Sequence, residues 1–155
     1  MKNLERLNFL IDVVKQEIKY LEYSDKRVFS ETFTIKKAKT LTIDAELAEK
    51  VEAFGSRFGR LQNTVGDKLL PLWLQAIGEK TAAFIDNLNK AEKLKALESA
   101  ERWMEVRHLR NQMIHEYIKD HQVLADALQS AHEEVDFIRK FAENLIHDIN
   151  RRNIL

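Results

Sequence analysis

Several features that would narrow the class of this protein are absent from its sequence. There is no cysteine, which excludes a disulfide framework, a thiolate metal site and a cysteine nucleophile. The formal charge is zero because 25 basic residues balance 25 acidic ones, which argues against a basic surface that covers the whole molecule. No stretch reaches the ~18 consecutive apolar residues of a membrane span, and the amino-terminal stretch contains acidic residues. We therefore expect a cytoplasmic protein that does not enter a membrane.

Residues that interrupt secondary structure are also scarce. The chain has four glycines and one proline among 155 residues, so few turns and long elements are expected. A chain of this length typically folds as one domain around one core. We therefore treat residues 1–155 as a single domain.

Apolar residues recur every three or four positions over most of the chain, which is the pattern of amphipathic helices. The stretches with this pattern are 4–21, 44–69, 81–93, 99–118 and 124–149. Asp44 is placed to cap the second stretch, Pro71 is expected to kink or end it, and Ser99 or a neighbour starts the fourth. The sequence predicts an all-α protein, an up-and-down antiparallel bundle of about five helices.

Residues 24–43 interrupt the helical pattern. Phe29, Glu31, Phe33 and Ile35 alternate as in a strand, but a lone strand has no partner for its backbone hydrogen bonds. We expect an irregular ordered arm here, or a small hairpin completed by residues 41–43.

The stretch LRNQMIHEYIKD, residues 109–120, places polar side chains where a packing face is expected. Met104, His108, Asn111, His115 and Ile118 form one helical stripe with apolar ends and a polar centre. A neighbouring stripe contains Trp103, Arg107, Arg110, Ile114 and Tyr117. A single buried histidine or arginine in a bundle is usually a satisfied structural group, but an unpaired charge on a packing face would be costly.

Arg110 and His115 are about 140° apart around a helix, so one helix does not bring them easily to one ligand. A two-fold axis that joins two copies of this helix could line one cleft with both pairs. We therefore expect a homodimer.

The segment RNQMIHEY, residues 110–117, resembles the signature of HEPN domains, and the pattern Arg-Asn-x-x-x-His-x-Tyr resembles the toxin of HEPN/MNT toxin–antitoxin pairs. Segments 54–71 and 84–117 are similar to that group in order and spacing, and the resemblance covers roughly residues 45 to 150. Asn63 stands where the family pattern leads us to expect an aspartate.

The resemblance implies a metal-independent endoribonuclease that acts as a homodimer and is silenced by a small MNT-type nucleotidyltransferase antitoxin. Arg110 and His115 match the catalytic pair, Asn111 a supporting polar group, and Tyr117 the tyrosine to which the antitoxin transfers AMP from ATP. No metal and no cofactor of this chain's own are implied.

The residue types suit that chemistry. Histidine has the side-chain pKa that a proton acceptor needs near neutral pH, so His115 would activate the 2′-hydroxyl of RNA. A guanidinium meets two phosphoryl oxygens at once, so Arg110 would stabilise the phosphorane. Arg107 and His108 could add positive charge for RNA, or Arg107 could pair with Glu101 or Glu105.

Two other classes of function fit the same sequence. The chain could be a non-catalytic substrate-binding or scaffold subunit of a nucleotidyltransferase, or a purely structural helical dimer. Tyr117 could likewise be a core tyrosine with a satisfied hydroxyl. The intact set of Arg110, Asn111, His115 and Tyr117 favours the ribonuclease, because a scaffold does not need a polar centre in its packing stripe.

Overall fold

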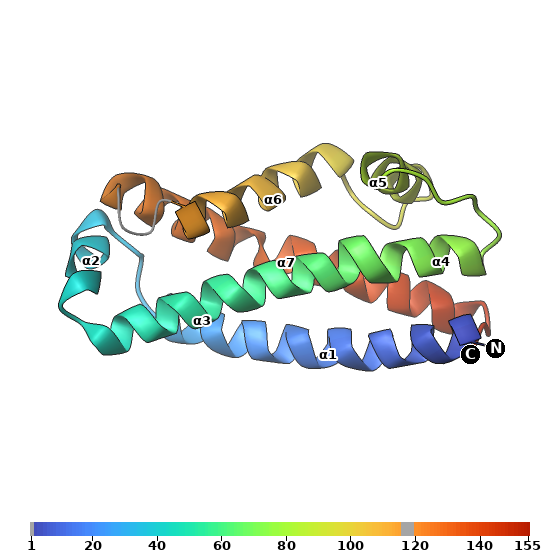
Figure 1. The fold of residues 1–155 in the computed structure, drawn as a ribbon, viewed down its shortest axis with the longest axis horizontal. Helices are drawn as coiled ribbons and strands as arrows, with labels where there is room; N and C mark the ends of the chain where they lie inside the picture. Colours follow the sequence, from blue (N-terminus) through green and yellow to red (C-terminus); the bar gives the residue numbers. More distant parts are fainter. Residues whose placement is uncertain (1, 116–119) are drawn as a thin grey trace.

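The prediction of an all-α antiparallel bundle is confirmed. The structure is a computed structural model that describes residues 2–115 and 120–155, and it contains no strand within those ranges. The long helices are α1 (Lys2–Val28), α3 (Ala45–Gln62), α6 (Ala100–His115) and α7 (His121–Arg151), and they run alternately up and down (Figure 1). In the part of the chain that is described, no helix is both long and apolar enough to cross a membrane.

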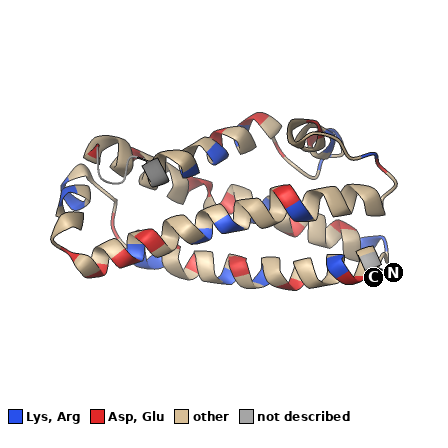
Figure 2. Ribbon diagram, in the orientation of Figure 1, with Lys and Arg blue, Asp and Glu red and all other residues tan. Residues whose placement is uncertain are grey.

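The long helices pack around one core. α1 packs against α3, α3 against α6, α6 against α7, and α7 against α1. The largest fully buried side chains are Trp73, Trp103, Phe54, Phe58 and Phe141. Charged residues of both signs alternate along the outer sides of α1 and α3 (Figure 2), as expected for solvated faces of a bundle.

Two predicted helix starts are confirmed by their caps. The Asp44 carboxylate accepts a hydrogen bond from the Leu47 amide at 3.0 Å, where α3 begins. The Ser99 hydroxyl accepts one from the Arg102 amide at 3.1 Å, where α6 begins. Such caps satisfy amides that have no partner inside the helix.

Of the two expectations for residues 24–43, an ordered arm or a small hairpin, the hairpin is wrong and the arm is partly helical. α1 continues to Val28, and the arm then forms the short helix α2 (Ile35–Lys39) and the 3₁₀ turn η1 (Thr40–Thr42). Phe29 and Phe33 alternate because both fill the space over α3 and α7: Phe29 stacks on the His132 ring, with 4.5 Å between centroids, and Phe33 is buried. The Phe33 amide donates to the Gln129 side chain of α7 at 3.1 Å, so it does not need a strand partner.

Pro71 does not end the second predicted helix. A π-helical segment, η2 (Asn63–Leu69), leads directly into α4 (Leu70–Ala76), and Pro71 is the second residue of α4. The helix stops before Gly78, whose positive φ of 82° favours glycine. The next helix, α5 (Phe84–Lys93), corresponds to the predicted 81–93 stretch.

Candidate functional site

The face of α6 that packs into the bundle is not the one that the sequence pattern indicated. Met104, His108 and Asn111 are exposed, so the predicted packing stripe faces away from the core. The buried residues of α6 are Ala100, Trp103, Val106 and Met113, so the packing side lies beside the neighbouring stripe and shares Trp103 with it. The Trp103 ring packs against the Phe141 ring of α7, with 5.1 Å between ring centroids. Arg110 belongs to this packing side and Asn111 does not.

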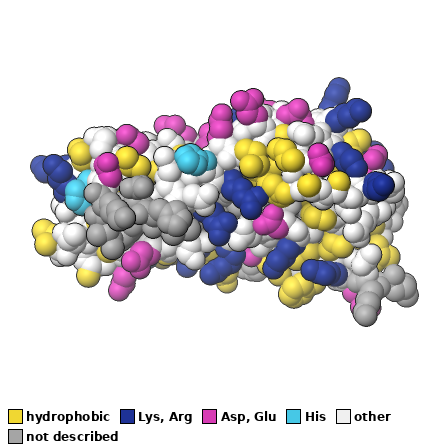
Figure 3. All heavy atoms as spheres, turned by 45° about the horizontal axis from the view of Figure 1, so that its top comes forward, with side chains coloured by type: hydrophobic (Ala, Val, Ile, Leu, Met, Phe, Trp, Pro, Cys, Tyr) yellow, Lys and Arg dark blue, Asp and Glu magenta, His cyan; other side chains and the backbone are white. Residues whose placement is uncertain are grey.

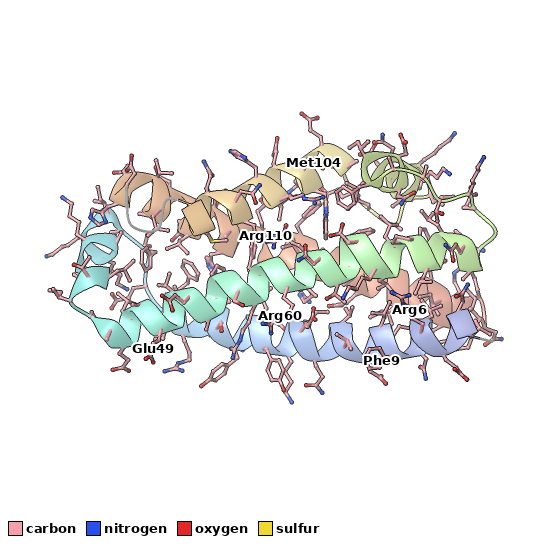
Figure 4. The ribbon with its side chains drawn as sticks, in the orientation of Figure 1. Arg6, Phe9, Glu49, Arg60, Met104 and Arg110 are labelled. Atoms are coloured by element: carbon pink, nitrogen blue, oxygen red, sulfur yellow. The ribbon has the colours of Figure 1, made fainter. Side chains whose placement is uncertain are left out.

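Arg110 is held between α6 and α3. Its Nη1 donates a hydrogen bond to the Asn63 side-chain oxygen at 3.0 Å, and its aliphatic part lies across Gly59. A Cβ at position 59 would lie 2.6 Å from the Arg110 Nε, so only glycine leaves room for this path. Figure 4 shows Arg110 on the side of α6 that faces α3. The half-buried Arg110 guanidinium is therefore held in place by Asn63.

Arg107 lies one turn before Arg110 on α6. Its guanidinium carbon is 4.4 Å from the centre of the Phe84 ring, a cation–π contact with the first residue of α5. Behind this contact, Gly66 approaches the rings of Phe84 and Trp103 closely, since a Cβ there would lie 3.2 Å from both. We call this closely packed place the α6 seam; it leaves no free space for a water molecule and is lined by Gln62, Asn63, Asp67, Phe84, Trp103, Arg107 and Arg110.

Positive charge at and beside the α6 seam is not neutralised by ion pairs. Within residues 2–115 and 120–155, no carboxylate oxygen lies within 4.0 Å of the charged nitrogens of Arg60, Lys68, Arg107 or Arg110. Lys and Arg side chains gather in the middle of the corresponding face in Figure 3. The lining of the α6 seam thus holds two guanidinium groups and one carboxylate, that of Asp67, and this excess of positive charge suits a phosphate-bearing ligand.

The opposite side of α6 carries negative charge. A shallow groove between α6 and α7 has Met104, Val106 and Leu109 among its apolar residues. Its acidic residues are Glu101, Glu105, Glu133 and Glu134. Of these, Glu134 is neutralised by Arg102, which donates to it at 2.8 and 3.1 Å. α6 therefore separates a basic seam from an acidic groove.

The structure brings together some of the predicted site residues. Arg107 and Arg110 line the α6 seam together, whereas His108 lines the acidic groove and Asn111 is exposed. His115 is the last residue of α6, and its side chain lies outside the described part, as does Tyr117. The pairing of Arg110 with His115 and the role of Tyr117 remain predictions.

Sequence reasoning missed Gly59 and Gln62, and it noticed Asn63 only as a departure from the family pattern. Each lies on α3 or at its end, about fifty positions before Arg110, so their meeting depends on how α3 packs against α6.

No protein-family model, no curated protein and no solved structure matches this chain.

Proposed function

We propose that this protein is a metal-independent endoribonuclease of the HEPN type, the toxin of a toxin–antitoxin pair. The observation that carries the proposal is the placement of Arg110. Asn63 accepts its hydrogen bond through a neutral oxygen, so Arg110 is positioned without losing its charge to a carboxylate. A structural arginine in a bundle would ordinarily be paired with an acid.

The proposed reaction uses the 2′-hydroxyl of the RNA as nucleophile. His115 takes the proton of this hydroxyl while the 2′-oxygen attacks the adjacent phosphorus. The bond from phosphorus to the 5′-oxygen breaks, the leaving oxygen takes up a proton, and a 2′,3′-cyclic phosphate remains. Arg110 stabilises the negative charge on the phosphorane, and Arg107 adds to the positive potential that holds the RNA backbone.

The active form in this proposal is a homodimer in which two copies of α6 face one cleft. Met104, His108 and Asn111 form an exposed stripe on α6 that such a partner helix could cover. The antitoxin, an MNT-type nucleotidyltransferase, transfers AMP from ATP to Tyr117 and so adds bulk and negative charge beside the site.

The test is cleavage of a labelled single-stranded RNA by purified protein in excess chelator. Intact mass first establishes that Tyr117 is unmodified. Arg110→Ala and His115→Ala are expected to lower the rate about 10²- to 10³-fold, because each removes a group that acts in the transition state. Arg110→Lys keeps the charge but not the planar guanidinium. Relative to Arg110→Ala, it should restore RNA binding better than RNA cleavage.

Arg6→Ala is the matched control, because Arg6 is exposed on α1, on the opposite side of the bundle from α6 (Figure 4). It should cleave like the wild type, and the products should end in cyclic phosphate. Equal cleavage by wild type and both site variants would show a contaminating nuclease and refute the proposal.

The acidic groove favours a second candidate function, a non-catalytic binding subunit of a nucleotidyltransferase. Three glutamates there, Glu101, Glu105 and Glu133, have no ion pair among the described residues. Together with the apolar floor they suit a basic amphipathic helix of a partner. This candidate predicts that unmodified wild type does not cleave RNA, and that Glu105→Lys weakens binding of the nucleotidyltransferase.

A further inference from the structure

Gln62 is a buried amide whose polar atoms have no partner. The residue is 4 % exposed, in the last turn of α3. Its side-chain Nε2 and Oε1 are both shielded from solvent, and neither has a hydrogen-bond partner in the described part of the chain. Buried amides are normally hydrogen-bonded, so an orphaned donor and acceptor at the same position require an explanation.

The surroundings of Gln62 combine polar, charged and aromatic side chains, unlike an apolar core. Gln62 lines the α6 seam beside Asn63, which holds Arg110, and beside the Phe84 ring. The ring face is covered by the Arg107 guanidinium at 4.4 Å. An amide, an aromatic face and two guanidinium groups therefore meet in the α6 seam.

We infer that the α6 seam is a base-binding subsite, in which Gln62 hydrogen-bonds the edge of an RNA base next to the phosphate that Arg110 binds. This inference rests on the proposed function and adds a basis for substrate specificity. An amide presents one donor and one acceptor side by side, which matches the paired donor and acceptor on a base edge. Adenine is the base that glutamine pairs with most commonly, so adenine is expected to bind best.

Arg107 closes the subsite in the free protein. When RNA arrives, its phosphate competes with Phe84 for the Arg107 guanidinium, since a charge-assisted contact to phosphate is stronger than a cation–π contact at a partly exposed ring. The movement of Arg107 uncovers the Phe84 ring, on which a base can stack, and gives access to the Gln62 amide. Backbone binding and base recognition are thus coupled through one side chain.

The experiment measures binding of fluorescent, uncleavable 2′-O-methyl oligonucleotides of A, C or U by anisotropy. The variants are Gln62→Leu, which has a similar size and no amide, and Phe84→Leu, which removes the ring. Gln75→Leu is the matched control, because Gln75 is exposed on α4 and away from the seam. Thermal unfolding of each variant establishes that it is folded.

Wild type and Gln75→Leu should bind the adenine oligonucleotide about tenfold more tightly than the others. Gln62→Leu should bind all three equally, and its affinity should still fall with salt as that of the wild type does. Phe84→Leu should bind all three more weakly. A preference that persists in Gln62→Leu, or its absence in the wild type, would overturn the inference.

The inference and the proposed function fail in different ways. Arg110-dependent cleavage without any base preference would leave the ribonuclease standing and remove the subsite. A Gln62-dependent preference in a protein that never cleaves RNA would support the subsite and remove the ribonuclease. A Gln62-dependent preference for C or U would support the subsite and overturn the assignment to adenine.

Discussion

Two regions of this bundle differ in whether their polar and charged side chains have hydrogen-bond or ion-pair partners. At one end of the molecule, the Asp148 carboxylate of α7 accepts from the Trp73 indole at 2.8 Å and from Arg151 and Arg152 at 2.7 Å each. In the α6 seam, Gln62 has no hydrogen-bond partner and Arg107 no ion pair among the described residues. The first region is fully satisfied and the second is not.

The pKa of Asp148 shows which effect dominates in the satisfied region. Burial alone would raise the pKa of this carboxyl, but the bonds from Arg151, Trp73 and Arg152 outweigh burial, and the pKa lies below its usual value. Asp148 therefore stabilises the fold. In the α6 seam, by contrast, the buried Gln62 amide without a partner lowers stability, and the binding proposed above would offset that cost.

Among changes that leave Arg110 itself in place, the largest expected effect in the α6 seam comes from Gly59→Ala. The new methyl group would collide with the Arg110 side chain, which is flexible enough to move, so the fold should remain while Arg110 leaves Asn63. We expect RNA cleavage to fall at least about tenfold, since misplacing a catalytic group by an ångström is costly. Cleavage assays and thermal unfolding on the same sample measure both effects.

Gly55→Ala is the matched control for this change. Gly55 lies one turn earlier on α3, and nothing lies within 4 Å of a Cβ built there. Both alanines should gain about 0.5–1 kcal/mol from helix propensity. Equal cleavage by the two variants would show that the path of Arg110 over Gly59 does not matter for activity.

In the satisfied region, Asp148→Ala should lower stability without changing RNA binding. The buried Trp73 indole loses its acceptor, which costs about 1–3 kcal/mol. The expected drop in Tm is a few degrees for a chain of this size. Unchanged stability at neutral pH would contradict the contrast drawn between the two regions.

The stability that Asp148→Ala removes should become smaller as pH falls. Because the folded pKa of Asp148 is lowered, its contribution is present above the unfolded pKa, about 3.9, and is lost as pH falls through the folded value. The free energies of unfolding of wild type and variant should therefore become equal in acid. A difference in stability between wild type and Asp148→Ala that grows below pH 4 would refute this account.

The smallest expected effect is at Glu17 of α1, which accepts a hydrogen bond from Thr64, the residue after Asn63. Burial raises the pKa of Glu17, although the Thr64 hydroxyl donates to it at 3.0 Å and Arg60 and Lys68 lower the pKa. Glu17→Gln keeps an acceptor for Thr64 and removes the buried charge. It should stabilise the protein at neutral pH by less than about 1 kcal/mol.

The Glu17→Gln gain should vanish in acid. A carboxyl with a raised folded pKa costs stability as pH rises from its ordinary value, 4.5, through the folded value, so below 4.5 the wild type also holds a neutral group. Thermal unfolding at pH 3.5 and pH 7.5 measures the difference. A gain of equal size at both pH values would mean that charge is not its cause.

The sequence predicted the helices well because their signals are local. Asp44 and Ser99 act within three residues, and the apolar spacing of α7 reports its buried face directly. The packing side of α6 was mistaken because apolar and polar residues lie on both flanks of this helix. Only contact with α7 distinguishes Trp103, which is buried, from Met104, which is exposed.

The polar residues of α6 were noticed from sequence, but their partners were not. Arg110 depends on Asn63 and Gly59, and these meet it only because α3 packs against α6 in one particular register. Similarly, Phe29 and Phe33 mimic a strand because both fill the core from an irregular segment. Contacts between residues that lie far apart in the sequence could therefore not be predicted before the packing of the helices was known.

The π-helical turn between α3 and α4 sets the rotational phase of α4. Leu61 and Trp73 are twelve positions apart, so at about 100° per residue an unbroken α-helix would place them about 120° apart around its axis. The wider turn over Asn63–Leu69 takes up about one extra residue and returns Trp73 to the buried side, within reach of Asp148. For the phase of α4, the number of residues in this segment matters more than their identity: deleting one would rotate Trp73 away from Asp148, whereas most single substitutions would leave the phase intact.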